Sequence, residues 1–351
     1  MRIRSLSQLL AAFAILLIAG CEKSATTTTG NPPPSPAGPV ASVGAYTISG
    51  PYTHQNLSIF LFHGADTVKG KTYLTLQEAM EQKKVIVHET GQVNELSIEN
   101  LSSTDEVYVQ SGDIVKGGKQ DRVIAVDFIV PAKSGKMPID SFCVESGRWQ
   151  ARGGENVQAF ASSAQQVPSK ELKLAAKQAA NQNEVWKQVA ESQTKLAENL
   201  KSEVRAGQSA SSLQLTLENK TVQKTTDEYV KNLKDVIKDK PDVVGFAFAI
   251  NGEVNSADTY ASHDLFVKLW PKLLQASATE AIGEIKEGKQ HAPAKVEAVQ
   301  ASITDAEKGK KSEKSVSARV KMETSETKDN VRFRTYDAKD GSVVHENLVK
   351  K

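Results

Sequence analysis

The chain has 351 residues, with 44 basic and 42 acidic side chains and a formal net charge of +2 at pH 7. Without Arg2 and Arg4, which belong to an N-terminal signal, the two signs balance. A nucleic-acid-binding protein needs a basic excess, so the composition argues against DNA or RNA as a partner.

The first 20 residues have the pattern of a bacterial lipoprotein signal peptide. Arg2 and Arg4 precede the apolar run 9–18, and small residues then lead to Cys21. A membrane-spanning helix needs about 20 apolar residues, roughly twice this run, so a cleaved signal over 1–20 is favoured over a transmembrane anchor. The mature chain would then begin at Cys21 and carry lipid there, including palmitate, which anchors it stably to a bilayer.

Residues 21–43 follow as a Thr/Pro-rich segment without large apolar side chains, which predicts a disordered tether. Glu22, rather than aspartate, follows the cysteine, and this favours a periplasm-facing outer-membrane location. The expected partners are the lipid bilayer, through lipidated Cys21, and a protein of the cell envelope. Only Cys143 remains as a thiol, so an internal disulfide is excluded.

Residues 44–160 are expected to be rich in antiparallel strands, because their connections are too short for crossover helices. One helix is predicted over 73–84, with Thr75 and Glu78 forming a capping box. Alternation of apolar and polar residues predicts the strands 56–64, 85–89, 93–102, 106–112, 119–135 and 138–149.

The second half of the chain alternates between helical and strand patterns. Residues 169–205 read as one long helix or a helix pair capped by Ser169. Residues 211–282 read as strand, helix, strand, helix: the first helix over 226–239, the second strand over 243–253, and a second helical region over 256–283, where Pro271 forces a boundary or a kink. A helix over 294–309 and strands over 316–326, 331–338 and 342–350 complete the chain.

These elements predict an α+β fold, with an antiparallel β-sandwich or partial barrel flanked by helices. The main domain is placed at 44–285. Residues 286–351 are expected to be a C-terminal extension made of a helix and a β-hairpin, whose last strands either form a small sheet or join the main one.

Four motifs in fixed order resemble a family of bacterial proteins, the ADP-ribosylglycohydrolase- and rhodanese-phosphatase-associated domain. They are GDIVKGGKQDR (112–122), FCVESGRW (142–149), AINGE (249–253) and a helix containing Leu-Trp-Pro (269–271). The resemblance covers about residues 45–285. It implies no established activity, cofactor or catalytic residue, and only an association with ADP-ribose and phosphate chemistry.

The motif at 112–122 is the most polar of the four motifs. Its two glycines could cradle an anion with their backbone amides while basic side chains supply charge and aspartates orient them or bind a cation. The competing interpretation is a β-hairpin with a Gly-Gly turn. The candidate ligand-binding residues here are Asp113, Lys116, Gly117, Gly118, Lys119, Asp121 and Arg122.

The motif at 142–149 adds Glu145, Arg148 and Trp149 as candidate ligand-binding residues, through stacking and an anion clamp. Cys143 could act as a nucleophile, but a small buried residue is the more common role of a lone cysteine. Trp149 could equally be a core residue.

Glu253 is a further candidate, as an acid or base with Asp258, although Asn251-Gly252 before it is explained by a tight turn. The six histidines are scattered without metal-ligand spacing, so no metal site is predicted, and any cofactor stays unknown.

Three functions are consistent with these features. The first is a lipid-anchored envelope protein that binds a ligand or partner through a polar groove around 116–122 and 145–149. The second is an extracytoplasmic hydrolase acting on a phosphorylated or glycosidic, ADP-ribose-like ligand. The third is a structural envelope protein that pairs with another chain through the helix at 169–205. Whether the chain is an enzyme stays open.

Overall fold

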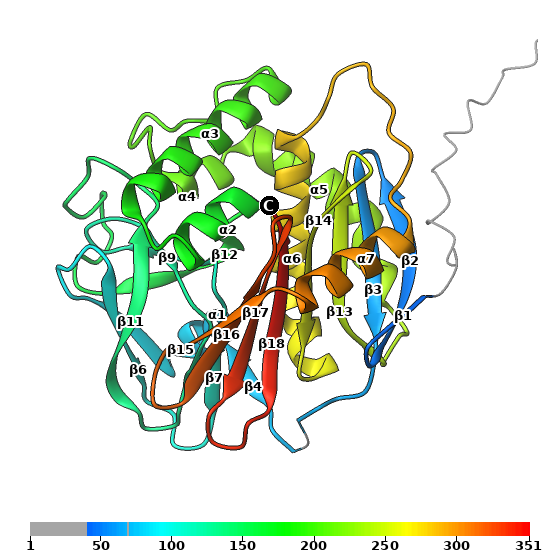
Figure 1. Cartoon of the computed structure of the whole chain (residues 1–351). Coiled ribbons are helices and arrows are strands. Elements are labelled where there is room, and N and C mark those ends of the chain that lie inside the picture. Colours follow the sequence, from blue (N-terminus) through cyan, green and yellow to red (C-terminus); the bar gives the residue numbers. More distant parts are fainter. Residues whose placement is uncertain (1–40, 69) are drawn as a thin grey trace, which may run out of the picture. The chain divides into compact units, whose positions relative to one another are not determined.

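The computed structural model describes residues 41–68 and 70–351 (Figure 1). The predicted signal peptide, Cys21 and the tether up to residue 40 lie outside the described residues. The last three residues assigned to the tether form strand β1 (Ala41–Val43). Within the described segments, none of the helices is both long and apolar enough to cross a membrane.

A nine-stranded antiparallel sheet combines strands from the beginning, the middle and the end of the domain (Figure 1). The C-terminal strands join this sheet, because β18 (Val343–Lys350) pairs with β14 (Glu253–Tyr260). The edge strand β15 has all six residues exposed, three of them lysines. In spatial order the strands are β1, β2 (Tyr46–His54), β3 (Leu57–His63), β13 (Val243–Ile250), β14 (Glu253–Tyr260), β18 (Val343–Lys350), β17 (Asn330–Asp337), β16 (Val320–Glu326) and β15 (Lys310–Ser315).

A six-stranded antiparallel sheet curls into a partial barrel. Its two edges meet where His88 forms a β-bridge with Ala159, and the Glu89 amide donates to the Gln158 carbonyl at 2.9 Å. Inward-facing Val87, Ile98 and similar side chains fill the interior. In spatial order the strands are β12 (Phe160–Gln166), β8 (Asp113–Gly117), β9 (Arg122–Ile124), β11 (Gly135–Cys143), β6 (Glu95–Asn100) and β5 (Val85–Glu89).

A small third sheet, ordered β10 (Phe128–Val130), β7 (Glu106–Val109) and β4 (Tyr73–Thr75), leads into helix α1 (Leu76–Glu81). The predicted capping box is confirmed: the Glu78 amide donates to Thr75 Oγ1 at 3.2 Å, and the Thr75 amide donates to Glu78 Oε2 at 2.8 Å. The α+β class, the large antiparallel sheets and the partial barrel are as predicted. The exception is β4, which pairs with β7 in parallel, because α1, β5 and β6 lie between these two strands and make the connection long enough for a crossover.

Helices cover both faces of the nine-stranded sheet. On one face Trp270 and Phe266 of α6 pack on Phe246 of β13. On the other face Val299 of α7 packs in a cluster with Ala247. The helices are α2 (Lys170–Lys177), α3 (Gln182–Leu200), α4 (Leu213–Leu217), α5 (Lys220–Leu233), α6 (His263–Gly283) and α7 (Val296–Glu307), and a 3-10 turn (Lys234–Ile237) follows α5.

The segment 169–205 is a helix pair, with Ser169 accepting from the Leu172 amide at 3.1 Å as the predicted cap. Val185, Val189 and Leu196 of α3 are buried inside this domain. The stripe that suggested pairing with another chain therefore packs on the chain's own core.

Three predicted elements were wrong. The strand over 119–135 is broken into β9 and β10, because Asp127 turns into the interior and accepts from the Ser111 amide at 2.8 Å and from Lys177 at 3.1 Å. The helical region over 256–283 begins only at His263, and the residues before it are strand β14, whose burial on both faces removes the alternation typical of a half-exposed strand.

The third error concerns the start of 211–282, which is the short helix α4 rather than a strand. Ser212 caps it by accepting from the Leu215 amide at 3.1 Å. Further along, Pro271 lies inside α6, which continues through it to Gly283.

Candidate functional site

Two of the predicted motifs come together at one end of the partial barrel. Strands β8 and β9 form a hairpin in which Val115 lies opposite Arg122. Strand β9 also pairs with β11, which places Cys143 opposite Arg122. The loop after β11 then folds back, so that Arg148 Nη2 lies 3.7 Å from Asp121 Oδ1.

The hairpin turn requires glycine at position 118. Gly118 has φ of 55°, and a Cβ added there would lie 2.4 Å from Cζ of the Phe160 ring. Only a residue without a side chain fits this close approach. The Gly-Gly pair is therefore explained by backbone geometry and ring packing.

Backbone amides around this turn bind carboxylates, and the carboxylates belong to the protein itself. The Gly117 amide donates to Asp121 at 3.0 Å, the Lys119 amide to Glu89 at 3.1 Å, and the Asp121 amide to Glu145 at 3.3 Å. Of the two glycine amides that were predicted to cradle an anion, that of Gly117 binds Asp121 and that of Gly118 donates to the Asn156 carbonyl at 3.0 Å, so neither is free for an external anion.

Two arginines complete a buried ion cluster with these carboxylates. Arg148 binds Glu145 through Nε at 2.8 Å and Nη2 at 2.7 Å. Arg152 binds Asp121 at 3.0 and 3.2 Å and Glu155 at 2.8 Å. Such two-pronged pairs fix both partners in orientation as well as in charge. Arg148 is therefore an internal clamp on Glu145.

The pKa values in the cluster follow its packing. Burial is the largest effect on Glu145 and acts to raise its pKa, but the hydrogen bonds from Arg148, Ser209 and the Asp121 amide, together with the charge of Arg148, hold that pKa below its ordinary value. At Asp121 burial prevails over the hydrogen bond from Arg152, and the pKa is raised.

Arg122 lies at the bottom of the cluster with a side chain that is 0% exposed. Its Nη1 donates to the Gln120 carbonyl at 3.1 Å, and its Nη2 lies 3.5 Å from Glu89. Among the described residues, Nε and Nη2 of Arg122 have no hydrogen-bond partner. Arg122 was predicted to bind a ligand, but its side chain is fully internal.

Trp149 lies over these cations at the surface. Its ring centroid is 5.6 Å from the Arg122 guanidinium carbon and 5.1 Å from Lys119 Nζ. The tryptophan is 45% exposed, so it is not a core residue. In the described part of the chain, no carboxylate forms an ion pair with Lys119, which leaves its ammonium available to a ligand.

Cys143 is buried next to this cluster. Burial raises the pKa of its thiol to about 11, and the nearby carboxylates of Glu89 and Glu145 contribute in the same direction. Gln182 binds both the amide and the carbonyl of Cys143 at 2.8 Å. A thiol that stays protonated at neutral pH is a poor nucleophile, so the geometry favours a packing role.

The remaining candidates lie elsewhere. Lys116 pairs with Glu218 at 2.7 Å instead of facing a ligand. Asp113 pairs with Lys272 at 3.0 Å in a separate buried region. Glu253 is exposed at the start of β14, in the nine-stranded sheet.

Three members of the cluster, Glu89, Arg152 and Glu155, were not predicted. Glu89 ends β5, and its partner Lys119 is 30 residues away, so no local pattern links them. Arg152 follows Trp149 closely in the chain, and its position in the same loop was the one available signal. Over residues 41–68 and 70–351, no group of three or more His, Cys, Asp or Glu side chains has a geometry suited to a metal ion.

A protein-family model matches residues 45–349 of the chain, and its description is the ARG and Rhodanese-Phosphatase-superfamily-associated Protein domain. The match extends beyond residue 285, where the resemblance in the sequence ended, and includes the C-terminal strands of the nine-stranded sheet. Searches of curated proteins and of solved structures find no match.

Proposed function

We propose that this chain, which belongs to the ARG and Rhodanese-Phosphatase-superfamily-associated Protein domain family, is a lipid-anchored cell-envelope protein that binds an anionic ligand at Trp149. The family supplies no activity. The proposal therefore depends on the signal sequence and on the geometry around the tryptophan.

The lipid anchor is supported by the signal pattern and by Cys21 after small residues. Expression of the full chain with radiolabelled palmitate tests it. Label is expected in the wild type and is expected to be lost in Cys21→Ser. Equal labelling of the two chains would contradict the anchor.

The observation that carries the binding proposal is the exposed Trp149 ring beside the Lys119 ammonium, which forms no ion pair with any other described residue. An aromatic face stacks on the flat face of a sugar or base, and an adjacent ammonium attracts phosphate or carboxylate. The ion pairs of Arg148 and Arg152 underneath hold the loop in place, so the surface is organised before the ligand arrives.

This combination favours a ligand with a ring and a negative charge, and we take phosphorylated monosaccharides as its class. Arg148 and Arg152 are bound to internal carboxylates, and the Arg122 side chain is 0% exposed, so the charge for the ligand comes from Lys119. The expected affinity is modest, since one ammonium and one ring supply it.

The test uses the purified full chain and glucose 6-phosphate, with glucose as the neutral comparison. Tryptophan fluorescence and calorimetry are expected to show binding of the phosphate ester that is weakened at least about fivefold in Lys119→Met and in Trp149→Ala, a loss near 1 kcal/mol for each contact. Lys136→Met removes an exposed lysine of β11 and serves as the matched control.

Two results would contradict the proposal. One is glucose 6-phosphate binding that is equal in the wild type, Lys119→Met and Trp149→Ala. The other is that the wild-type chain does not bind the phosphate ester at all, although it gives the same folded signal as the Lys136→Met control.

A further inference from the structure

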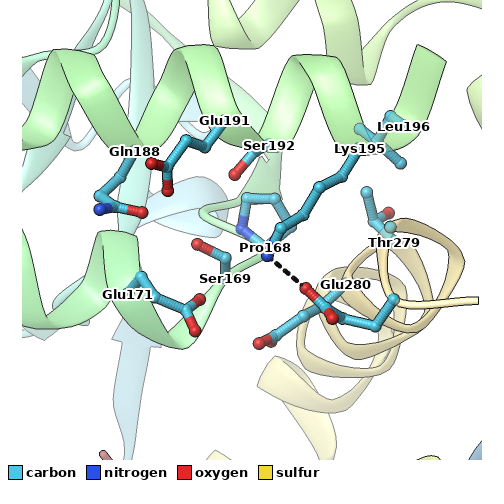
Figure 2. Close-up of a pocket in the computed structure, with 12 residues that line it drawn as sticks. Pro168, Ser169, Glu171, Gln188, Glu191, Ser192, Lys195, Leu196, Thr279 and Glu280 are labelled. Atoms are coloured by element: carbon cyan, nitrogen blue, oxygen red, sulfur yellow. Dashed lines mark hydrogen bonds and ion pairs between the residues drawn. The ribbon is translucent and has the colours of Figure 1, made fainter. Parts of the chain in front are cut away.

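A pocket lies between three helices, apart from the Trp149 surface. Figure 2 shows side chains from the start of α2, from α3 and from α6 around it. Pro168 and Ser169 close one side, and Leu196 and Thr279 lie at another. The pocket is narrow, with a volume of about 20 Å³ for a water-sized group such as an ammonium, and it opens to solvent.

Glu280 of α6 lines this pocket and is only 6% exposed. One of its oxygens, Oε1, accepts from Asn255 Nδ2 at 2.7 Å and from the Lys170 amide at 3.1 Å. The other, Oε2, is buried and has no hydrogen-bond partner among the described residues. A buried carboxylate oxygen without a hydrogen-bond donor is energetically costly, which indicates that a group from outside the protein donates to Oε2.

The charge around Glu280 selects the kind of donor. Four glutamates line the pocket, and the single lysine among the lining residues, Lys195, is bound to Glu284 at 2.5 Å. The glutamates are Glu171, Glu191, Glu280 and Glu284. An excess of negative charge around an unsatisfied acceptor favours a cation that donates hydrogen bonds.

We propose that this pocket binds the ammonium group of a small primary alkylamine, with Glu280 Oε2 as its buried acceptor. The described residues offer no trio of ligands arranged for a metal ion, which favours an organic cation. Pro168 and Leu196 supply apolar contacts for the alkyl part, while Glu171 and Glu191 add negative charge around the pocket. The site is separate from the surface proposed for the anionic ligand, so either can fail alone.

Protonation of Glu280 gives this site a pH signature. Burial raises the pKa of Glu280 to about 7; Lys173 and the bond from Asn255 act to lower it, and Glu171 acts to raise it. The charged groups facing it are Glu171 and Lys173 of α2, Glu191 and Lys195 of α3, and Glu284 of α6.

An alkylammonium binds the ionised carboxylate and keeps its own proton up to a pKa of about 10.4. The affinity of the pocket for the amine should therefore rise about tenfold between about pH 6 and about pH 8.

The experiment titrates the full chain with n-butylammonium, followed by NMR and calorimetry, and uses 1-butanol as the uncharged isostere. A dissociation constant of about 1 mM or tighter is expected at neutral pH. Glu280→Gln preserves the acceptor for Asn255 and the Lys170 amide while removing the charge. It is expected to weaken binding at least about tenfold and to abolish the pH dependence.

Glu228→Gln provides a matched control, because Glu228 is exposed on α5 and outside the pocket. This variant is expected to bind n-butylammonium as the wild type does. Circular dichroism of both variants establishes that they are folded.

The proposal is overturned if 1-butanol binds as tightly as n-butylammonium, because the site is then merely apolar. It is also overturned if folded Glu280→Gln binds the amine with wild-type affinity. Finally, a wild-type chain that shows no response up to about 10 mM n-butylammonium would mean that Glu280 Oε2 accepts hydrogen bonds from water alone.

Discussion

Replacing Asp127 by asparagine should cost this fold a large part of its stability. Asp127 lies at the junction of the three sheets, about 1% exposed, and accepts hydrogen bonds at both oxygens. Oδ1 accepts from the Ser111 amide at 2.8 Å, and Oδ2 accepts from Thr335 at 2.7 Å, His345 at 3.0 Å and Lys177 at 3.1 Å.

An asparagine amide has nearly the same shape but only one accepting end. In one orientation its NH₂ faces the Ser111 amide, and in the other it faces Lys177, Thr335 and His345. Either way a buried donor meets another donor, and the ammonium loses its counter-charge. Breaking a buried pair in this way costs about 3–5 kcal/mol, against a total stability of about 5–15 kcal/mol for a typical domain.

Urea unfolding followed by tryptophan fluorescence and circular dichroism measures this loss. The midpoint should fall with little change in slope, since the folded state buries the same surface. Asp239→Asn is the matched control, because Asp239 is exposed and its left-handed φ of 58° suits asparagine equally well.

Adding Lys177→Met to Asp127→Asn should recover part of the loss, since the Lys177 ammonium lies 4.8 Å from the Phe333 ring centroid, where a methionine can pack. A loss below about 1 kcal/mol for Asp127→Asn would refute the account, because it would mean that the buried charges are not coupled.

Three further predictions concern stability. Burial alone would lower the pKa of His345, but Asp127 and Asp258 raise it. The stability that these ion pairs add should therefore be full below about pH 6.5 and be lost as the pH rises through the raised pKa. Urea titrations across pH should show a flatter alkaline decline of stability in His345→Gln, and an unchanged profile would contradict the pairing. Gly118→Ala should destabilise by about 1–3 kcal/mol through its clash with Phe160, whereas Gly341→Ala, which shares a positive φ but has open space, should cost less in the same thermal-melt series. Thr75→Ala should cost about 1 kcal/mol through loss of the α1 cap, and a melting temperature equal to wild type would mean that the cap is redundant.

Features determined by near neighbours were predictable from the sequence. The Thr75–Glu78 capping box and the Asn251-Gly252 turn depend on residues within a few positions, and the structure has both. The hairpin at 117–118 and the approach of 116–122 to 145–149 followed from antiparallel strand pairing. Arg122 and Cys143 were on motifs already singled out, and β9 and β11 make them neighbours.

Features determined by distant partners were not predictable. The break after β9 depends on Asp127, whose partners Lys177 and His345 are 50 and 218 residues away. The strand β14 was assigned to a helix because it is buried on both faces and shows no alternation. Glu280 Oε2, which has no hydrogen-bond partner among the described residues, lies where three helices meet, and no local sequence pattern predicts it.

The edge strand β15 has a consequence for crowded surroundings. Its six residues, KKSEKS, are all exposed and carry three ammonium groups along the open side of the nine-stranded sheet. An open strand would otherwise offer its free amides and carbonyls to a second molecule, but lysines at that border repel an identical one. If copies are tethered side by side on a surface, where collisions between them are frequent, this border should keep them as separate molecules.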